Sequence, residues 1–406
     1  MDYNTYTLSN GIRLIHRPSL SLVAHVGLFI NAGSRDEEKQ EHGLAHFIEH
    51  AIFKGTKKRK VYHILSRLED LGGELNAFTS KEETCIHASF LKEDYPKTIE
   101  LISDILFNST FPENEIKREK EVIIDEINSY NDSPSELIFD EFENTIFNGS
   151  SIGRLILGNF ESLKSFNRQH ILKFIKKNYN TDQMILSSIG DIDFDKLIRI
   201  FTTYFEKAPL NNRKYQREKV SVYKPQHKVV KKDTFHSHCI IGNRAYCFSD
   251  KRRIALYLLN NIMGGPGMNS RLNMTIREKY GYSYNIESNF NSFTDTGIFS
   301  VYFSSDKINL ERALNEVYKE FERLCTKKLG VIQLSKAKRQ LNGQLAIAYE
   351  SNETQMLTNG KNFMIFEKIS NLDEIYRKIN SLTSQQLIDT ANEILNKKQM
   401  SSLIYQ

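Results

Sequence analysis

The sequence predicts an α+β protein built from two homologous α/β domains, each with a mainly antiparallel sheet flanked by helices that cover one side. A chain of 406 residues is too long for one ordinary core and suits two domains of about two hundred residues each. Short apolar segments bounded by turn residues predict strands, and apolar residues spaced three and four apart predict helices. Much of this pattern occurs twice, at a constant offset of 209 residues.

The first half of the chain opens with strand patterns. Asn10-Gly11 is a two-residue turn signal that predicts a hairpin over residues 5–18, and residues 22–30 predict a further strand. A strand pair is expected within residues 75–91 and a further strand over 184–190. The expected helices of this half cover residues 44–53, 62–71, 98–107, 113–130, 135–147, 168–179 and 193–205.

The second half repeats this order of elements. Gly264 follows Gly55 by 209 residues, and Asn285 follows Asn76 by the same number. A polar, charged stretch without periodicity separates the halves and predicts a linker. The expected boundaries are residues 1–210 for an N-terminal domain, 211–225 for the linker and 226–406 for a homologous C-terminal domain.

Composition limits the class of protein. Apolar residues make up 40% and charged residues 26%, as in soluble globular proteins. No apolar run approaches the roughly twenty residues that span a bilayer, and the first residues lack the pattern of a secretory signal. Four cysteines lack zinc-ribbon or redox spacing, and the net charge of +5 is spread along the chain. We therefore expect a cytoplasmic protein that binds neither nucleic acid nor membrane.

The most informative motif lies in the helix expected over residues 44–53. His46 and His50 are four residues apart, so their imidazoles project side by side, with Glu49 next to them. Imidazole nitrogen binds zinc readily, and a catalytic zinc site needs three protein ligands and a water that a carboxylate can deprotonate. The alternative interpretation of the motif alone is that two histidines share a helix face by chance.

With this His-x-x-Glu-His motif the chain resembles the inverzincin peptidases, the pitrilysin or insulinase-type family M16. Residues 31–35, 53–56 and 71–80 are similar to the shorter, processing-peptidase branch of that family. The resemblance runs from about Tyr6 to the final hundred residues. It implies a LuxS/MPP-like metalloprotease fold and a zinc-dependent endopeptidase.

The resemblance also implies the remaining residues of the zinc site. The family's third ligand is a glutamate on a later helix, and Glu126 lies at the matching position, 76 residues after His50. Glu119 matches the family's accessory glutamate, seven residues earlier. One Zn²⁺ per chain would then be held by His46, His50 and Glu126. Without the resemblance, Glu126 would be interpreted as a solvated acid in a charge-rich helix.

In the second half, the positions that match the zinc motif carry Ala255, Leu258 and Leu259, which cannot bind metal. This half instead resembles the family's second signature, with Arg277 and Tyr284 seven residues apart. In the family this pair faces the zinc and binds substrate near the scissile carbonyl. Without the resemblance, Arg277 would be interpreted as an arginine at a helix end and Tyr284 as a tyrosine in the core.

Two other patterns carry no predicted site. The glycine run at residues 264–267 lacks the Gly-Lys-Ser/Thr ending of a phosphate loop and is typical of a tight turn. His236, His238 and Cys239 lie in an expected strand with no further ligand at short spacing, so we predict no second metal there.

The expected reaction is peptide hydrolysis, with Glu49 activating a zinc-bound water while Tyr284 stabilises the oxyanion and Arg277 fixes the peptide backbone. Asn76, Ala77 and Phe78 are similar to the family's edge strand, to which an extended peptide could add. Family analogy implies unfolded peptide substrates in a closed chamber. Longer relatives carry four such domains in one chain, so a homodimer with a shared active site is expected.

The alternative from another functional class is a non-catalytic scaffold, or a partner subunit of a heteromeric peptidase. Family members that lack the zinc ligands have such roles. All four of these residues are present here, the three of the His-x-x-Glu-His motif and the third ligand, Glu126.

Overall fold

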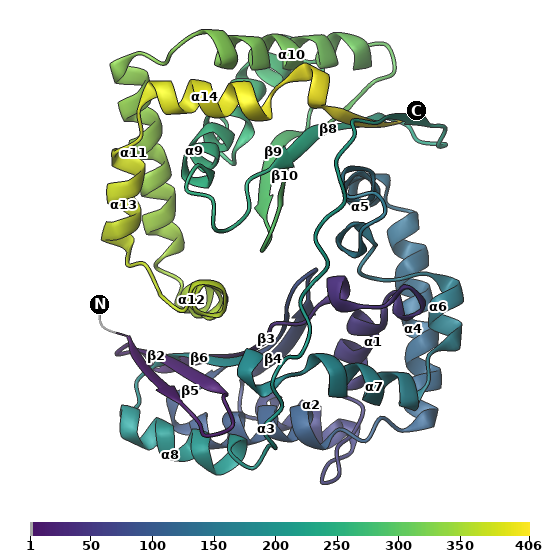
Figure 1. The fold of residues 1–406 in the computed structure, drawn as a ribbon, viewed down its shortest axis with the longest axis vertical. Helices are drawn as coiled ribbons and strands as arrows, with labels where there is room; N and C mark the ends of the chain where they lie inside the picture. The colour runs from purple at the N-terminus through teal and green to yellow at the C-terminus, as the bar shows by residue number, and fades with distance from the viewer. Residues whose placement is uncertain (1–2) are drawn as a thin grey trace. The chain divides into compact units, whose positions relative to one another are not determined.

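The computed structural model describes residues 3–406, and these form two compact units. Unit 1 comprises the chain up to Asn128 together with Arg154–Arg217 and Ala348–Ile369. Unit 2 comprises Ser129–Gly153, Glu218–Ile347 and Ser370–Gln406. The passage from Arg217 to Glu218 falls within the linker expected at residues 211–225. The two units are nevertheless not the two continuous halves of the sequence, because each unit contains a segment from the other half (Figure 1).

Unit 1 contains a six-stranded sheet in the order β1-β2-β6-β3-β5-β4. Only β2 and β6 pair in parallel, so the sheet is mainly antiparallel as expected. The predicted turn at Gly11 is present, with φ of 90°. The strands are β1 (Asn4–Thr7), β2 (Arg13–Pro18), β3 (Val23–Ile30), β4 (Glu74–Thr79), β5 (Thr84–Leu91) and β6 (Met184–Gly190).

One face of this sheet packs on a layer of helices and forms the main core of unit 1. Val26, Leu28 and Ile30 alternate along β3 and are fully buried against these helices. The short helix α6 was not expected from the sequence. The helices are α1 (Leu44–Ala51), α2 (Val61–Glu69), α3 (Tyr95–Asn108), α4 (Glu113–Asn131), which continues into unit 2, α6 (Phe160–Ser165), α7 (Arg168–Asn178) and α8 (Phe194–Phe205).

The other face of the sheet is covered as well, which corrects the interpretation that helices cover one side only. Helix α12 (Asn352–Phe366) comes from the second half of the sequence and packs on β3 and β6. Met356 is fully buried there, and a Cβ at Gly360 would lie 2.2 Å from Phe29 Cε2. Glycine at this position therefore lets α12 approach the sheet closely.

Unit 2 repeats the topology of unit 1. Its five-stranded sheet has the order β7-β11-β8-β10-β9, and the parallel pair β11 and β7 corresponds to β6 and β2. The same strand order in both sheets confirms the predicted homology. The strands are β7 (His227–Val230), β8 (Ser237–Ala245), β9 (Ile286–Ser292), β10 (Gly297–Ser305) and β11 (Ser401–Tyr405).

The second sheet also carries helices on both faces. The helix α5 (Pro134–Ile146), from the first half of the sequence, packs on β8 and β11 through Ile138 and Phe142. The helices on the opposite face include α9, α10 and α14, whose apolar residues form the second main core. The further helices are α9 (Arg253–Gly264), α10 (Leu310–Thr326), α11 (Val331–Ala348), α13 (Leu372–Asn380) and α14 (Ser384–Ile394).

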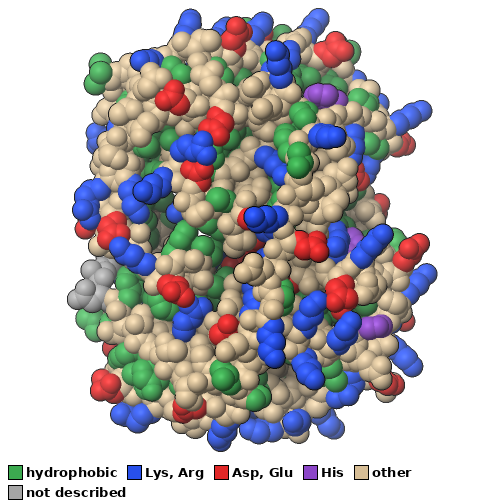
Figure 2. All heavy atoms as spheres, viewed as in Figure 1, with side chains coloured by type: hydrophobic (Ala, Val, Ile, Leu, Met, Phe, Trp, Pro, Cys, Tyr) green, Lys and Arg blue, Asp and Glu red, His purple; other side chains and the backbone are tan. Residues whose placement is uncertain are grey.

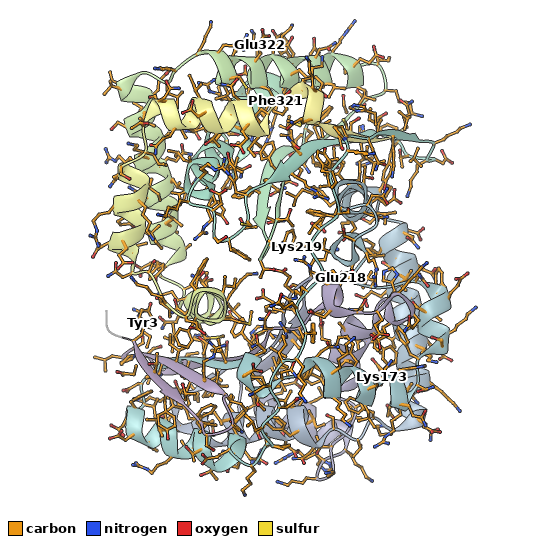
Figure 3. All side chains as sticks on the ribbon, in the orientation of Figure 1. Tyr3, Lys173, Glu218, Lys219, Phe321 and Glu322 are labelled. Carbon is orange, nitrogen blue, oxygen red and sulfur yellow. The ribbon has the colours of Figure 1, made fainter. Side chains whose placement is uncertain are left out.

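The first part of the expected linker is fixed to unit 1 by charged residues. Arg217 Nη2 donates to Asp36 Oδ2 at 2.8 Å and to the backbone oxygen of Glu82 at 2.7 Å. Both side chains of the Arg217–Asp36 pair are buried, and Glu82 Oε1 lies 3.7 Å from Arg217 Nη1, so the buried guanidinium has two acidic partners. Glu218 and Lys219, labelled in Figure 3, open the second segment of unit 2 directly afterwards.

Charged side chains are scattered over the visible face, and acidic groups lie among the basic ones (Figure 2). None of the described helices is both long and apolar enough to cross a bilayer.

Candidate metal centre

Helix α1 presents the three residues of the His-x-x-Glu-His motif. Its apolar side, including Phe47 and Ile48, is fully buried in the core of unit 1. His46 and His50 lie one turn apart with ring centroids separated by 4.7 Å, and Glu49 follows on the same turn. His46 is 7% exposed, while Glu49 and His50 are half-buried. The apolar face thus anchors the helix in the core, and the three side chains project away from that face.

Glu126 on α4 completes a group of three possible metal ligands. Glu126 Oε1 lies 3.7 Å from His46 Nε2, and Oε2 lies 3.6 Å from His50 Nε2. Within residues 3–406, these side chains form the only group of three with ligand atoms all within 4.8 Å of one another. Two atoms bound tetrahedrally to one zinc ion at about 2.0–2.1 Å are roughly 3.3–3.5 Å apart. The two histidine–glutamate separations are therefore within a few tenths of an ångström of those in a zinc site, and all three ligand atoms lie within 4.8 Å of one another.

The hydrogen bonds around His50 select the nitrogen that would bind the metal. His50 Nδ1 donates to Glu119 Oε2 at 3.2 Å, which leaves Nε2 facing Glu126. Lys54 Nζ lies 2.7 Å from Glu119 Oε1, so both oxygens of this buried carboxylate have partners. A carboxylate that holds the second nitrogen of a ligating histidine fixes its tautomer and ring orientation. Glu119 therefore lies where the accessory glutamate was expected.

The electrostatics of the histidines suit metal binding. Burial, together with the neighbouring His50, lowers the pKa of His46 to about 4. Burial also lowers the pKa of His50, but Glu119, Glu126 and Glu49 outweigh this and raise it overall. His46 is thus a neutral imidazole at neutral pH. A bound cation would compete with protonation of His50.

Glu49 has the properties of a general base. Burial raises the pKa of Glu49, Glu126 adds to the shift, and Thr79 and His50 oppose it. Glu49 Oε2 is buried and has no hydrogen-bond partner within residues 3–406. A carboxylate with a raised pKa and a free oxygen is suited to accept a proton near neutral pH.

Strand β4 lies beside this centre at the edge of its sheet. It pairs with β5 on one side only, and α1 packs against it. Asn76, Ala77 and Phe78 therefore occupy an edge strand as expected. Their backbone groups on the open side could pair with an extended peptide. Binding of substrate by these three residues stays a prediction.

Arg277 and Tyr284 lie together in unit 2. Arg277 belongs to a π-helical segment, Asn273–Lys279, a rare conformation that occurs frequently at functional sites. Its Cζ lies 4.8 Å from the centroid of the Tyr284 ring. Tyr284 is 82% exposed, so it is not the core tyrosine of the alternative interpretation. Both residues line a cavity of about 360 Å³ with Asn260, Asn273, Glu287 and Asn289. Their opposition to the metal centre stays a prediction.

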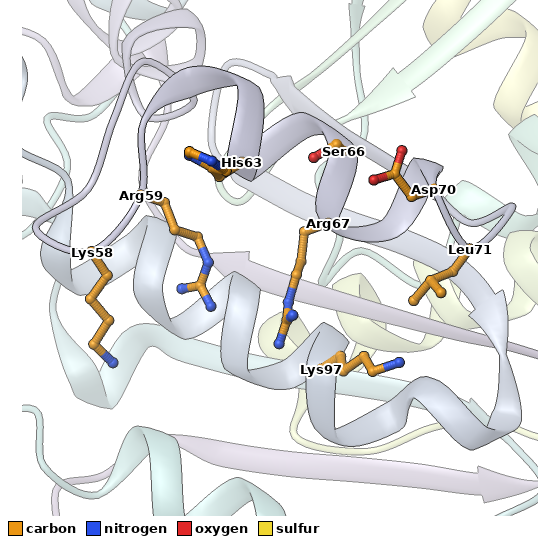
Figure 4. Close-up of a pocket in the computed structure, with 8 residues that line it drawn as sticks. All are labelled: Lys58, Arg59, His63, Ser66, Arg67, Asp70, Leu71 and Lys97. Atoms are coloured by element: carbon orange, nitrogen blue, oxygen red, sulfur yellow. The ribbon is translucent and has the colours of Figure 1, made fainter.

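A larger cavity, about 520 Å³, lies between α2 and α3 and contains none of the metal-ligand group (Figure 4). Its arginines are compensated by acids: Arg59 contacts Glu100 at 2.7 Å and Asp104 at 2.6 Å, and Arg67 lies 3.7 Å from Glu100. The two guanidinium groups of the lining are thus paired with two carboxylates. Cavity size therefore does not mark the chemical site in this molecule.

Three residues that support the centre had no role predicted from the sequence. Lys54 lies in the family-like stretch 53–56, and Thr79 lies in the strand pair expected within residues 75–91. Glu37 was assigned no role, although its carboxylate contacts the start of α1. Lys54 lies three residues after the end of α1, and this proximity is the one local signal that could have identified it.

Comparisons with known proteins place these observations in a family. The family model described as Insulinase (Peptidase family M16) matches residues 15–159, and that of the Peptidase M16 inactive domain matches residues 165–341. An uncharacterized zinc protease of Bacillus subtilis is 31% identical over 98% of this chain and 97% of its own length. The mitochondrial-processing peptidase subunit beta of Saccharomyces cerevisiae is 30% identical over 98% of this chain and 89% of its own length.

The fold agrees with solved structures. A protease from Helicobacter pylori superimposes with a TM-score of 0.93 at 22% identity, over 100% of this chain and 99% of the other. A protein from Pseudomonas fluorescens described as a peptidase M16 inactive domain gives the same TM-score at 19% identity, over 100% of this chain and 98% of the other. These likenesses support the two-unit fold. The sequence matches show that the chain belongs to the M16 family of peptidases.

Proposed function

We propose that this protein is a zinc-dependent endopeptidase that hydrolyses unfolded peptides. The observation that carries the proposal is the convergence of His46, His50 and Glu126, with Glu49 on the same helix as both histidines. The spacing of these atoms fits zinc, and the relatives named as zinc proteases align over nearly the whole chain.

A zinc ion, when bound, would supply Lewis acidity that lowers the pKa of water and polarises the scissile carbonyl. Glu49 accepts the proton from the attacking water and passes it to the leaving amine. Glu119 keeps the proton of His50 on Nδ1, so that Nε2 stays available as a ligand. Lys54 in turn fixes Glu119.

The substrate would bind as an extended chain on the open edge of β4. Main-chain hydrogen bonds to Asn76, Ala77 and Phe78 demand little of substrate side chains, so sequence preference should be broad. Arg277 would fix the peptide backbone, and the phenol of Tyr284 would donate to the developing oxyanion. Family analogy supports a closed chamber that admits unfolded chains and excludes folded proteins.

For the assembly we propose a homodimer in which Arg277 and Tyr284 of one copy serve the metal centre of the other. The alternative is a heteromeric enzyme in which this chain is one subunit, as the yeast relative's name states for that protein. A catalytically silent role is disfavoured because the ligand group and Glu49 are intact. Purified protein that is active on its own would exclude the need for another subunit.

We also propose a cytoplasmic location. Cys85 and Cys239 are buried free thiols, and Cys247 and Cys325 are half-buried without a disulfide partner. Unpaired cysteines agree with a reducing compartment.

The direct test is digestion of an unfolded peptide mixture by purified protein, with products identified by mass spectrometry. We expect internal cuts that disappear after treatment with a chelator and return when zinc is added. Removal of single terminal residues would contradict the endopeptidase proposal. Cleavage that is insensitive to metal removal would contradict the zinc mechanism.

A further inference from the structure

Helix α1 begins without a capping side chain of its own. Gly43 occupies the position before the first helical residue, with φ of 92°, and has no side chain to accept a hydrogen bond. The first intrahelical bond runs from Phe47 N to Gly43 O at 3.0 Å. The N–H groups ahead of Phe47 therefore have no partner within the helix and need acceptors from elsewhere.

Glu37 supplies these acceptors from six residues upstream of Gly43. Its Oε2 accepts from Gly43 N at 3.0 Å, and its Oε1 accepts from Ala45 N at 2.8 Å. The side chain is buried, with Glu37 only 4% exposed. One side chain thus uses both of its oxygens to satisfy N–H groups at the start of the helix.

Opposing effects act on the pKa of Glu37. Burial raises it, with a smaller contribution from Glu41, the N–H groups of Ala45 and Gly43 and the charge of Arg154 lower it, and the net pKa is about 8. Arg154 Nη1 also donates to the backbone oxygens of Glu37 and Glu38, both at 3.1 Å. Arg154 thus holds the backbone of this segment, while the side-chain oxygens of Glu37 are held by the helix terminus.

The surrounding backbone allows the start of α1 little freedom. A Cβ at Gly43 would lie 2.6 Å from Gly158 Cα, and Ser162 Oγ donates to His42 O at 2.6 Å. Helix α1 has only eight residues, so a shift of its first turn moves His46 and His50 with it. Metal sites need their ligands within about 0.5 Å of the productive geometry.

We propose that Glu37 is a positioning residue of the metal centre, which fixes the first turn of α1 and thereby the two histidine ligands. This inference rests on the proposed zinc site. Glu37 acts through the backbone of α1 and contacts neither ligand side chain in the hydrogen bonds described. Its removal should therefore change metal affinity and coordination geometry.

Two variants and one matched control test this role. Glu37→Gln keeps the size of the side chain but replaces one acceptor oxygen with a donor, and Glu37→Asp keeps the charge but is too short to reach both N–H groups. The control is Glu41→Gln. Glu41 is 3% exposed, lies in the same segment, and accepts from Glu38 N at 3.0 Å without contacting α1. Its other neighbour is Lys173 on α7, at 3.8 Å, which is labelled in Figure 3.

Zinc affinity is measured by competition with a chromophoric chelator on metal-free protein, and cobalt-substituted protein reports ligand geometry through its visible absorption. We expect both Glu37 variants to bind zinc about 10- to 100-fold more weakly than wild type, the range for residues that orient metal ligands. Their cobalt spectra should be altered, whereas Glu41→Gln should match wild type in both measurements.

Equal affinity and an unchanged cobalt spectrum in the Glu37 variants would overturn the inference, as would an equal loss in Glu41→Gln. Failure of both Glu37 variants to fold, with Glu41→Gln folded, would make Glu37 a folding residue and would also overturn it. Wild-type protein that binds no zinc in the same titration would instead refute the proposed function.

Discussion

Lys54 Nζ lies 2.7 Å from Glu119 Oε1, and this ion pair holds the carboxylate whose other oxygen accepts from His50. The pair connects Lys54, three residues after the end of α1, to helix α4, which also carries Glu126. The metal centre is therefore supported by contacts between α1 and α4 that lie outside the ligands.

Lys54→Met should weaken zinc binding. Loss of the ammonium leaves Glu119 Oε1 without its partner, so the carboxylate can rotate and release His50. We expect a loss of about tenfold in zinc affinity, at the low end of the range for such supporting contacts. Lys97→Met is a suitable control, because Lys97 pairs with Asp94 on the surface at 2.8 Å. A zinc affinity for Lys54→Met equal to that of the control would show that the ion pair does not matter.

Replacing a ligand should remove metal and activity together. We expect His46→Ala, His50→Ala and Glu126→Ala to lose bound zinc after dialysis, because only two protein ligands remain. Glu119→Ala should retain the ligands but bind zinc about 10- to 100-fold more weakly. Metal content by atomic emission and peptide turnover are measured on the same samples. Full zinc content in Glu126→Ala would mean that the third ligand has been misassigned.

Complementation between inactive variants tests the shared active site. Glu49→Gln and Tyr284→Phe should each be nearly inactive as homodimers. In a mixed dimer, one of the two sites would have both its own Glu49 and the opposing Tyr284, so mixing should restore part of the turnover. Tagged pull-down establishes that subunits have exchanged. Exchange without recovered turnover, or a fully active monomer by analytical ultracentrifugation, would rule out sharing between copies.

His16 should make unit 1 sensitive to acid. It is fully buried on β2, with Nδ1 3.1 Å from Ser188 Oγ, and burial lowers its pKa to about 4 from an ordinary value of 6.5. The unfolded chain takes up this proton first as the pH falls, so stability is intact above pH 6.5 and declines towards pH 4. Between pH 7.5 and 5 the loss from this residue is about 2 kcal/mol.

The measurement is urea unfolding of metal-free protein at both pH values. His16→Gln should lose about 2 kcal/mol less than wild type over this interval, whereas replacement of the exposed His63 should leave the pH dependence unchanged. An identical pH dependence in wild type and His16→Gln would exclude His16 as the source.

Much of the fold and the ligand group could be predicted because their signals are local. The strand over 184–190 was predicted with its observed bounds, and the four-residue spacing of His46 and His50 put both on one helix face. Glu126 needed the family resemblance, since nothing in a charge-rich helix distinguishes one ligand from its neighbours. The repeat at a constant offset predicted that the two halves share one fold, whereas the order of strands within each sheet was not predicted.

The remaining features depend on tertiary contacts that leave no local pattern. An amphipathic helix shows that it has an apolar face but not which sheet that face covers, so the exchange of α5 and α12 between the units could not be predicted. Glu37 carries no periodic signal either, because its partners are backbone N–H groups several residues away. Its role becomes visible only when the loop before α1 is folded back on the helix.

The central claim is that Glu49 is the base in a zinc-dependent hydrolysis, and Glu49→Gln tests it most directly. The amide has nearly the same shape but cannot take a proton from water, while the three ligands are unchanged. Bound zinc and peptide turnover are measured on the same preparation. We predict a normal zinc content with turnover reduced by about a hundredfold or more. Near-normal turnover by the zinc-loaded variant would contradict the assigned mechanism.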